Sequence, residues 1–495
     1  MKIPGIFHKL ASSRRNRAFV VGITALVASL IYLIAGNSWA EPGYPLDDAW
    51  IHQTYARNLV QNGEWSFIPG QVSGGSTSPL WTLILSIGQA LGIPGFWTYA
   101  AGIILSAATA MVGVEIIIKA GANPLTSLFF GLFLATEWHL VWASVSGMET
   151  ILLVLVILLF FFFLFDTRYP WAVGLLIGIA IWIRPDSISL VGPWLWVFIF
   201  TRPKRQNEWK SLITGGLLLL MLTGLYLVFN YFLTGNIIPN TFYAKQAEYA
   251  SMLEAPILAR YFRLFWLPWI GASVLLLPGL AVSIIVFLKT KRYACCAPIL
   301  WALGYVAIFA ARLPVTYQHG RYIMPAMPVF FLAGFWGVQK AIRFFGNSSA
   351  WRRILRASWI TSIIAAQVGF LFLGARSFAN DVAFINMEMV TTAQWIRDNT
   401  EKDAVIAAHD IGAIGYFSER EIIDLAGLVT PEVIPFIRDE LKIADYITSK
   451  DADYLVIFPG WYPALAEGAN PVYYSDAEYS PELGGENMHV YRWLP

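Results

Sequence analysis

The feature of this sequence that most restricts its possible folds is a succession of long apolar stretches between residues 18 and 375. Many approach the length of about twenty residues at which a helix can cross the hydrocarbon core of a bilayer. Apolar residues make up 57% of the chain and charged residues only 13%, a balance that excludes an ordinary soluble enzyme. The net charge of +2 gives no indication of a nucleic-acid partner. The sequence therefore predicts a polytopic α-helical membrane protein.

Clusters of basic residues indicate which connecting loops face the cytoplasm. Such clusters lie at 2–17, 202–210, 289–292 and 340–356, and loops rich in Lys and Arg stay on the cytoplasmic side of a membrane. The first cluster precedes an apolar run at 19–35 that resembles a signal peptide, but we interpret this run as an uncleaved anchor. Each cluster therefore fixes one loop on the inside.

With these loops inside, the chain must cross the membrane an odd number of times between the first external loop and residue 202. The segment 79–93 is the weakest candidate, being only about fifteen residues long, and we expect it to form an interfacial or re-entrant helix. The predicted spans are 18–36, 96–119, 124–142, 148–166, 170–184, 187–201, 211–233, 264–288, 294–312, 322–339 and 357–375. The sequence thus predicts about eleven crossings and an external C-terminus.

Two adjacent carboxylates follow the first apolar run, where the chain should emerge from the bilayer. Asp47 and Asp48 begin a segment with apolar residues at helical spacing that closes at Asn62-Gly63, which predicts an amphipathic helix on the membrane surface. Asp47 could simply cap this helix while Asp48 favours its first turn. Alternatively, one carboxylate could act as a general base, or the pair could hold a divalent metal together with His52.

The predicted topology also collects further polar residues at the outer membrane boundary. Ionisable groups at membrane depth are costly and are therefore functional candidates. Arg184, Lys245 and Arg321 are cations that could bind a phosphate leaving group, Arg in a bidentate manner and Lys as a point charge. Alternatively, each could be an interfacial anchor, and Arg184 could pair locally with Asp186.

From Arg376 onward the hydropathy falls and the pattern becomes that of a soluble domain. Helical periodicity at 384–399 and 431–449 alternates with predicted strands at 404–408, 421–428 and 454–458. Alternation of this kind predicts a small α/β domain. We therefore divide the chain into a membrane domain at 1–375 and an extracytoplasmic α/β domain at 376–495.

These motifs resemble bacterial GT-C glycosyltransferases, in particular the branch that contains the terminal arabinofuranosyltransferases and uncharacterised relatives. The resemblance covers nearly the whole chain and rests on 47–59, 77–81, 146–150, 184–186, 239–245, 320–322, 410–417 and 423–428. It implies a GT-C-like membrane fold, with Asp47 as the catalytic base and Asp48 beside it. The substrate-binding candidates within or beside these motifs are Arg57, Glu149, Arg184, Lys245, His319, Arg321 and Tyr322.

The resemblance further implies an inverting transferase of the cell envelope that needs no cofactor. Its donor would be a polyprenyl-phosphate monosaccharide, and its acceptor a glycan, lipid or protein on the outer face of the bacterial plasma membrane. Where the arabinosyl enzymes commonly have Gly-Glu-Arg-Val-Glu, this chain has Gly-Gln-Val-Ser-Gly at 70–74, so the resemblance does not extend to arabinose as the sugar. The alternatives are a transporter or flippase for a lipid-linked or anionic substrate, and a non-catalytic sensor.

Overall fold

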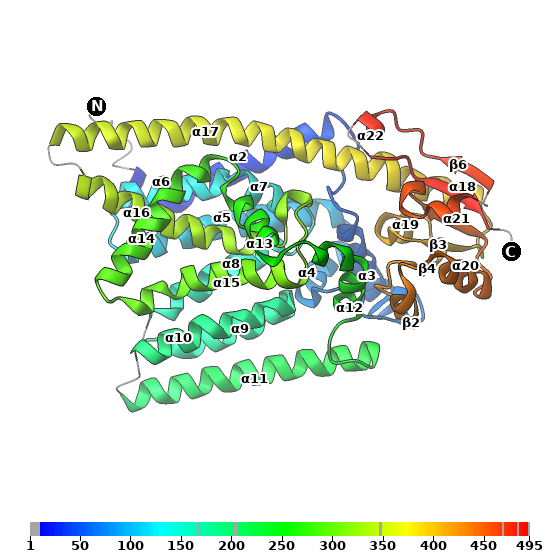
Figure 1. The fold of residues 1–495 in the computed structure, drawn as a ribbon, viewed down its shortest axis with the longest axis horizontal. Coiled ribbons are helices and arrows are strands. Elements are labelled where there is room, and N and C mark those ends of the chain that lie inside the picture. The colour runs from blue at the N-terminus through cyan, green and yellow to red at the C-terminus, as the bar shows by residue number, and fades with distance from the viewer. Residues whose placement is uncertain are drawn as a thin grey trace.

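A bundle of long helices occupies most of the molecule, and a small mixed sheet caps one end of it (Figure 1). The computed structural model describes residues 10–166, 168–201, 205–345, 349–467, 470–482 and 485–493. Some residues of the predicted cytoplasmic clusters lie outside these ranges, namely Lys2, Lys9, Arg202 and Lys204.

Seven helices in the described part of the chain are long and apolar enough to cross a membrane, or eight if one bent pair counts as a span. The seven are Arg14–Asn37 (α2), Pro94–Lys119 (α5), Gln206–Thr234 (α11), Ala272–Lys289, Tyr293–Arg312, Gln318–Arg343 and Ala350–Asn399. The bent pair joins Pro124–Thr136 (α6) to Trp138–Val145 (α7) at 53°. The protein is therefore a multi-pass membrane protein, as predicted.

Three predicted spans form helices that are shorter than the roughly twenty residues of an ordinary crossing. They are Thr150–Leu164 (α8), Pro170–Ile183 (α9) and Val191–Thr201 (α10), with 15, 14 and 11 residues. Proline opens α9 and a Pro-initiated turn separates it from α10, which limits the length of both. The total of about eleven crossings therefore stays a prediction.

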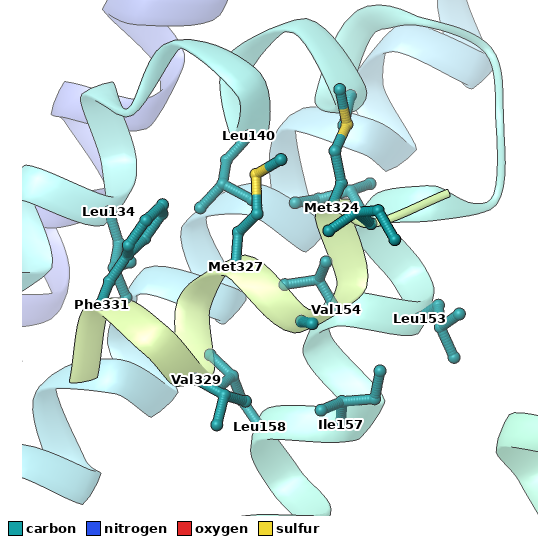
Figure 2. Packing of buried hydrophobic residues seen from close by; sticks show 14 of the residues in the cluster. Leu134, Leu140, Leu153, Val154, Ile157, Leu158, Met324, Met327, Val329 and Phe331 are labelled. Atoms are coloured by element: carbon teal, nitrogen blue, oxygen red, sulfur yellow. The ribbon is translucent and has the colours of Figure 1, made fainter. Parts of the chain in front are cut away.

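Close helix packing holds the centre of the bundle together. A Cβ atom on Gly337 would overlap the backbone oxygen of Gly279, so only glycine lets Leu277–Lys289 (α14) and Met327–Phe345 (α16) approach this closely. Figure 2 shows the neighbouring apolar contacts, in which Met327 and Phe331 of α16 lie among side chains of α6, α7 and α8. This packing fixes the outer end of α16, just after Tyr322.

The segment after α2 forms the predicted helix after Asp47 and a second short one. Asp48–Asn62 is α3, and Gly63 ends it in the left-handed conformation (φ 70°). A small hairpin follows, with strands Ser66–Ile68 (β1) and Gln71–Val72 (β2), and then the twelve-residue helix Pro79–Ala90 (α4). α4 packs beside α3 and is too short to span a bilayer, which agrees with the predicted interfacial position.

The C-terminal region is a five-stranded sheet with strand order β4-β3-β5-β7-β6. β3 is parallel to β4 and β5, whereas β7 is antiparallel to β5 and β6. The strands are Val405–Ala408 (β3), Glu421–Asp424 (β4), Tyr454–Ile457 (β5), Asn470–Tyr474 (β6) and His489–Arg492 (β7), and the helices include Thr391–Asn399 (α18), Ile411–Phe417 (α19) and Glu440–Ser449 (α20). The predicted strands at 404–408 and 454–458 and the helix at 384–399 are confirmed, whereas the strand predicted at 421–428 ends at Asp424 and the helix predicted at 431–449 divides into a 3-10 turn and α20. The additions include α19, β6 and β7.

The two faces of this sheet bury different partners. One face packs against Ile443 and Ile447 of its own α20. The other face packs against Ile51, Tyr55 and Phe67 of the loop between α2 and α4. Because the loop supplies part of the sheet's core, the sheet is held over the N-terminal end of α3.

A continuous helix links the bundle to the sheet. Ser349–Phe384 (α17) passes through a π-helical turn at Ile385–Val390 into α18. The predicted domain boundary at 375/376 thus falls within unbroken helix, and it stays a prediction.

Among the remaining helices of the membrane part, Asn240–Glu248 (α12) supplies Lys245 and Glu248 to the lining of the site described below. This helix and Ile257–Trp266 (α13) follow α11, and Ala297–Arg312 (α15) precedes the short turn Gln318–Gly320. This turn carries the chain from α15 toward α16 and places the residue after it, Arg321, beneath α3.

Candidate active site

The two carboxylates at the start of α3 face different partners. Asp47 does not cap its own helix. Its two carboxylate oxygens accept hydrogen bonds from the backbone N–H groups of Gly412 (2.6 Å) and Ala413 (2.7 Å) in the first turn of α19. The N-cap interpretation is therefore wrong for α3, and Asp47 instead caps a helix of the C-terminal domain.

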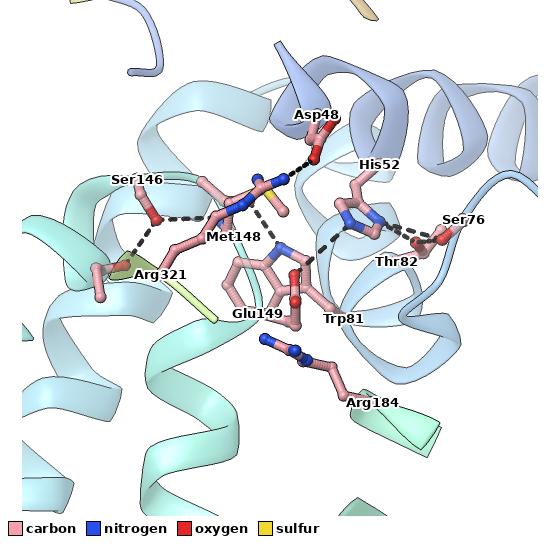
Figure 3. A network of polar contacts seen from close by, with 12 residues as sticks. Asp48, His52, Ser76, Trp81, Thr82, Ser146, Met148, Glu149, Arg184 and Arg321 are labelled. Carbon is pink, nitrogen blue, oxygen red and sulfur yellow. Dashed lines mark hydrogen bonds and ion pairs between the residues drawn. The ribbon is translucent and has the colours of Figure 1, made fainter. Parts of the chain in front are cut away.

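Asp48 lies in a cationic pocket on the membrane side. Arg321 donates a hydrogen bond to it, and the Lys245 ammonium lies 3.7 Å away. The hydroxyl of Tyr322 accepts hydrogen bonds from both cations, each at 3.0 Å. The structure thus brings together four of the residues predicted from the sequence, and Figure 3 shows Asp48 and Arg321 in contact.

Arg321 has unused donors. The residue is only 7% exposed, and in the described part of the chain its Nε and Nη1 atoms have no hydrogen-bond acceptor. Leaving charged donors buried without acceptors is costly. Arg321 lines a cavity, so an anion that reaches its side chain from that cavity could supply the missing acceptors.

Behind Arg321 lies a second layer of buried polar residues. Nε2 of His52 is 3.7 Å from Glu149, and Nδ1 of His52 lies near the hydroxyl groups of Ser76 (3.1 Å) and Thr82 (3.2 Å) (Figure 3). In the residues that the structure describes, no group of three or more His, Cys, Asp or Glu side chains is placed to hold a metal ion. His52 thus has a carboxylate near one ring nitrogen and two hydroxyl groups near the other.

Arg184 belongs to the same layer. Its Nε donates to Asp186 at 3.0 Å, and its guanidinium lies 5.4 Å from the centre of the Tyr322 ring. The local ion pair that the sequence allowed is therefore present. Arg184 therefore packs on the ring of the tyrosine whose hydroxyl contacts both Lys245 and Arg321.

Two candidates lie apart from Asp48. Arg57 donates a hydrogen bond to the backbone oxygen of Tyr416 at 2.7 Å, and its guanidinium lies 4.8 Å from the centre of the Tyr416 ring. Arg57 therefore connects α3 to α19. His319 adopts a left-handed backbone conformation (φ 55°), and its Nε2 is hydrogen-bonded to the Asp381 carboxylate at 2.7 Å. Its ring packs edge-on against Trp138 and Trp142. It lines a smaller neighbouring cavity of about 400 Å³.

A cavity of about 1080 Å³ lies between the membrane part and the C-terminal domain. Asp47, Asp48, Lys245, Arg321 and Tyr322 line its membrane side. The lining residues that the sequence did not single out include Glu248, Tyr249, Tyr317, His409, Trp461, Tyr462 and Glu486. Most of these come from the C-terminal domain, whose strand pattern gave no indication of which loop would face the membrane.

The environment gives the two carboxylates different acidities. Burial, Asp410 and Asp48 raise the pKa of Asp47 to about 7, although two backbone N–H groups oppose the shift. Burial would also raise the pKa of Asp48, but the charges of Arg321 and Lys245 overcome it and hold that pKa below its usual value. Asp47 therefore has the proton affinity of a general base near neutral pH, and Asp48 stays ionised beside the cations.

Gly412 controls how closely the C-terminal domain approaches Asp47. A Cβ atom at this position would overlap the backbone oxygen of Asp47 and press on its carboxylate. We expect Gly412→Ala to push α19 away from α3 and to increase cleavage by trypsin between the two domains. Gly369→Ala is the matched control, because a Cβ on Gly369 meets no atom within 4 Å; equal cleavage of both variants would show that this contact does not hold the domains together.

Comparisons with known proteins agree on the fold. A model for a domain of unknown function (DUF8728) matches residues 376–491. No curated protein sequence matches the chain.

Two solved enzymes share the architecture. ArnT from Cupriavidus metallidurans, solved bound to undecaprenyl phosphate, superposes with a TM-score of 0.62 at 14% identity, covering 95% of this chain and 97% of ArnT. An oligosaccharyltransferase from Archaeoglobus fulgidus, in complex with Zn and sulfate, superposes with a TM-score of 0.56 at 12% identity, covering 90% of this chain and 69% of that enzyme. Over nearly its whole length, this chain has the GT-C glycosyltransferase fold.

Proposed function

We propose that the protein is an inverting glycosyltransferase that moves a monosaccharide from a polyprenyl-phosphate carrier to an acceptor hydroxyl group. The observation that carries this proposal is Arg321, a buried cation with two unused donors that lines a cavity next to a carboxylate of pKa about 7. The undecaprenyl phosphate bound to ArnT, which has the same fold, supports a lipid phosphate as the leaving group.

The proposed reaction is a single displacement at the anomeric carbon. Asp47 removes the proton of the acceptor hydroxyl, its oxygen forms a bond to the anomeric carbon, and the bond to the phosphate oxygen breaks. The leaving phosphate gains negative charge next to Arg321 and Lys245. Cations fixed where charge develops stabilise the transition state more than the ground state, so the proposal needs no divalent metal.

Asp48 has a different role in this proposal. Without substrate it neutralises Arg321 and Lys245, which would otherwise repel each other. In the proposal, the phosphate meets the Nε and Nη1 groups of Arg321, which have no acceptor in the described part of the chain, while Nη2 keeps its contact with Asp48. Asp48 thus positions the cations, while Asp47 takes the proton.

Release of polyprenyl phosphate tests the proposal directly. Purified full-length protein is incubated in liposomes with polyprenyl-phosphate hexoses and pentoses, with and without glycan, lipid and peptide acceptors. We expect release of polyprenyl phosphate from one donor, accelerated by one acceptor class. Movement of the intact lipid-linked sugar between leaflets, with no release from any donor, would instead identify a flippase.

The site should face the outside of the bacterial plasma membrane. The motifs gather at the membrane end opposite the basic loops, and transporter sites lie near the midplane instead. We expect reporters fused after Lys210 or Arg292 to be cytoplasmic and one fused after Arg376 to be external, as read by paired alkaline phosphatase and fluorescent-protein fusions. A cytoplasmic signal after Arg376 would place the cavity on the wrong side for this reaction.

A further inference from the structure

The cavity has a second end, which the C-terminal domain builds. Strand β5 stops at Ile457, and the turn Pro459–Trp461 follows it directly. Trp461 is 55% exposed although it lines the cavity. Two rings pack against its indole ring. The centroid of Phe458 lies 5.4 Å from that of the indole, and the His409 ring lies 5.2 Å away at an interplanar angle of 88°. Trp461 therefore lines the cavity with about half of its surface uncovered.

Carboxylates line the cavity together with this ring. Glu486 accepts a hydrogen bond from the backbone N–H of Gly460 at 2.7 Å, and Glu440 accepts one from Leu465 at 2.9 Å. Both therefore sit in fixed positions with further lone pairs available, since a carboxylate has about four acceptor sites. Glu248, Asp410 and Arg438 also line the cavity, and contacts with His409 place Glu248 and Asp410 near Trp461.

His409 links two of the carboxylates, Glu248 and Asp410, to the tryptophan. Its side chain is 10% exposed, and its Nε2 lies 3.4 Å from Glu248. Nδ1 is 3.6 Å from Asp410, beyond hydrogen-bonding distance, and no other partner for it lies in the described part of the chain. This end of the cavity thus offers an aromatic ring and several hydrogen-bond acceptors.

The two ends of the cavity suit different ligands. Arg321 and Lys245 at the membrane end attract a phosphate, whereas the carboxylates around Trp461 disfavour any anion. An aromatic face beside fixed hydroxyl acceptors is the arrangement that binds a sugar ring, whose C–H face is apolar and whose edge carries hydroxyl donors.

We propose that this end is the acceptor subsite, and that an uncharged sugar ring of an acceptor glycan stacks on Trp461 and donates hydroxyl hydrogen bonds to the carboxylates around it. The inference rests on the proposed glycosyl transfer and narrows its acceptor from a glycan, lipid or protein to a glycan without acidic groups at this position. It also gives the C-terminal domain a role, since Trp461 and three of the carboxylates come from that domain.

Binding of soluble oligosaccharides to the full-length, detergent-solubilised protein tests this inference without any donor. Saturation-transfer NMR is recorded with a panel of neutral glucose, galactose, mannose and N-acetylglucosamine oligosaccharides and with trigalacturonate. We expect at least one neutral oligosaccharide to bind and trigalacturonate not to bind. Trp461→Ala should weaken binding about ten-fold or more, and Trp461→Phe should retain part of it because a smaller ring remains.

Tyr474→Ala is the matched control, because Tyr474 is an aromatic residue of the same domain with 51% exposure outside the cavity; it should bind like the parent. The inference is overturned if no neutral oligosaccharide binds, if trigalacturonate binds as tightly, or if Trp461→Ala binds like the parent. Release of polyprenyl phosphate is measured separately. If that release occurs while Trp461→Ala binds like the parent, the subsite fails and the transferase function stands.

Discussion

The Asp47→Asn variant is expected to lose about 10²–10⁴-fold in the rate of sugar transfer, the usual contribution of a general base. Asn has nearly the same size as Asp but cannot take the proton of the acceptor hydroxyl. The rate of polyprenyl phosphate release at saturating donor measures the effect. Asp48→Asn should lose less, because Lys245 and Arg321 remain in place to meet the phosphate.

The pH dependence separates basicity from structure. Because the pKa of Asp47 is about 7, its base form dominates above pH 7, and we expect turnover to fall about ten-fold per unit as the pH drops below that value. Asp48, whose pKa is lowered, stays ionised over the same range. The residual activity of Asp47→Asn should lack this fall in turnover at low pH, which is the acid limb of the pH–rate profile.

One complication of Asp47→Asn has its own control. The amide can accept only one of the two hydrogen bonds from α19, so the contact between the domains weakens as well. Gly412→Ala weakens the same contact but keeps the carboxylate, so it should be slower yet retain an acid limb. Full turnover of Asp47→Asn, or an unchanged acid limb in that variant, would assign proton transfer to another group.

Removal of the Arg321 guanidinium is expected to have the second large effect. We expect Arg321→Ala to lower turnover by about 10²–10³-fold, as loss of one preorganised donor to a developing anion does. Arg321→Lys keeps the charge but loses the planar fork, and Lys cannot supply donors at the Nε and Nη1 positions. It should still lose about ten-fold or more.

The matched control is Arg312→Ala, which removes an exposed arginine that stacks on Phe242 at 4.5 Å at the end of α15. It should transfer sugar like the parent. An interfacial anchor would tolerate lysine, since Lys reaches the interface as Arg does. If Arg321→Lys and the parent have equal turnover at all donor concentrations, Arg321 does not bind the phosphate.

The sequence predicted the parts of the fold that have a strong local signal. Helix α3 has apolar residues at helical spacing and a glycine stop, and strands β3 and β5 are short apolar runs. α19 was missed because its seven residues are too few to show periodicity. Strands β6 and β7 carry polar residues and lack a clear alternation, so they gave no strand signal.

Within the site, the sequence identified residue types better than partners. Asp48, Lys245, Arg321 and Tyr322 were all predicted and do meet. Arg57 and His319 come from the same motifs but point elsewhere, because neighbours on a helix or in a tight turn face different directions. The bond between Asp47 and Gly412 joins residues 365 positions apart, and local pattern carries no information about such contacts.

The unbroken helix from the bundle to the sheet makes bilayer thickness relevant to the site. The helical stretch Ala350–Asn399 has 50 residues and is therefore about 75 Å long, whereas the hydrocarbon core is about 30 Å thick. A helix accommodates a thinner bilayer by tilting. If it tilted by about 10° around its membrane section, its far end would swing by several ångströms, a displacement comparable to the size of a sugar ring. The hydrogen bonds from α19 to Asp47 at the start of α3 oppose that swing. We therefore expect the thickness of the bilayer to influence how wide the cavity is.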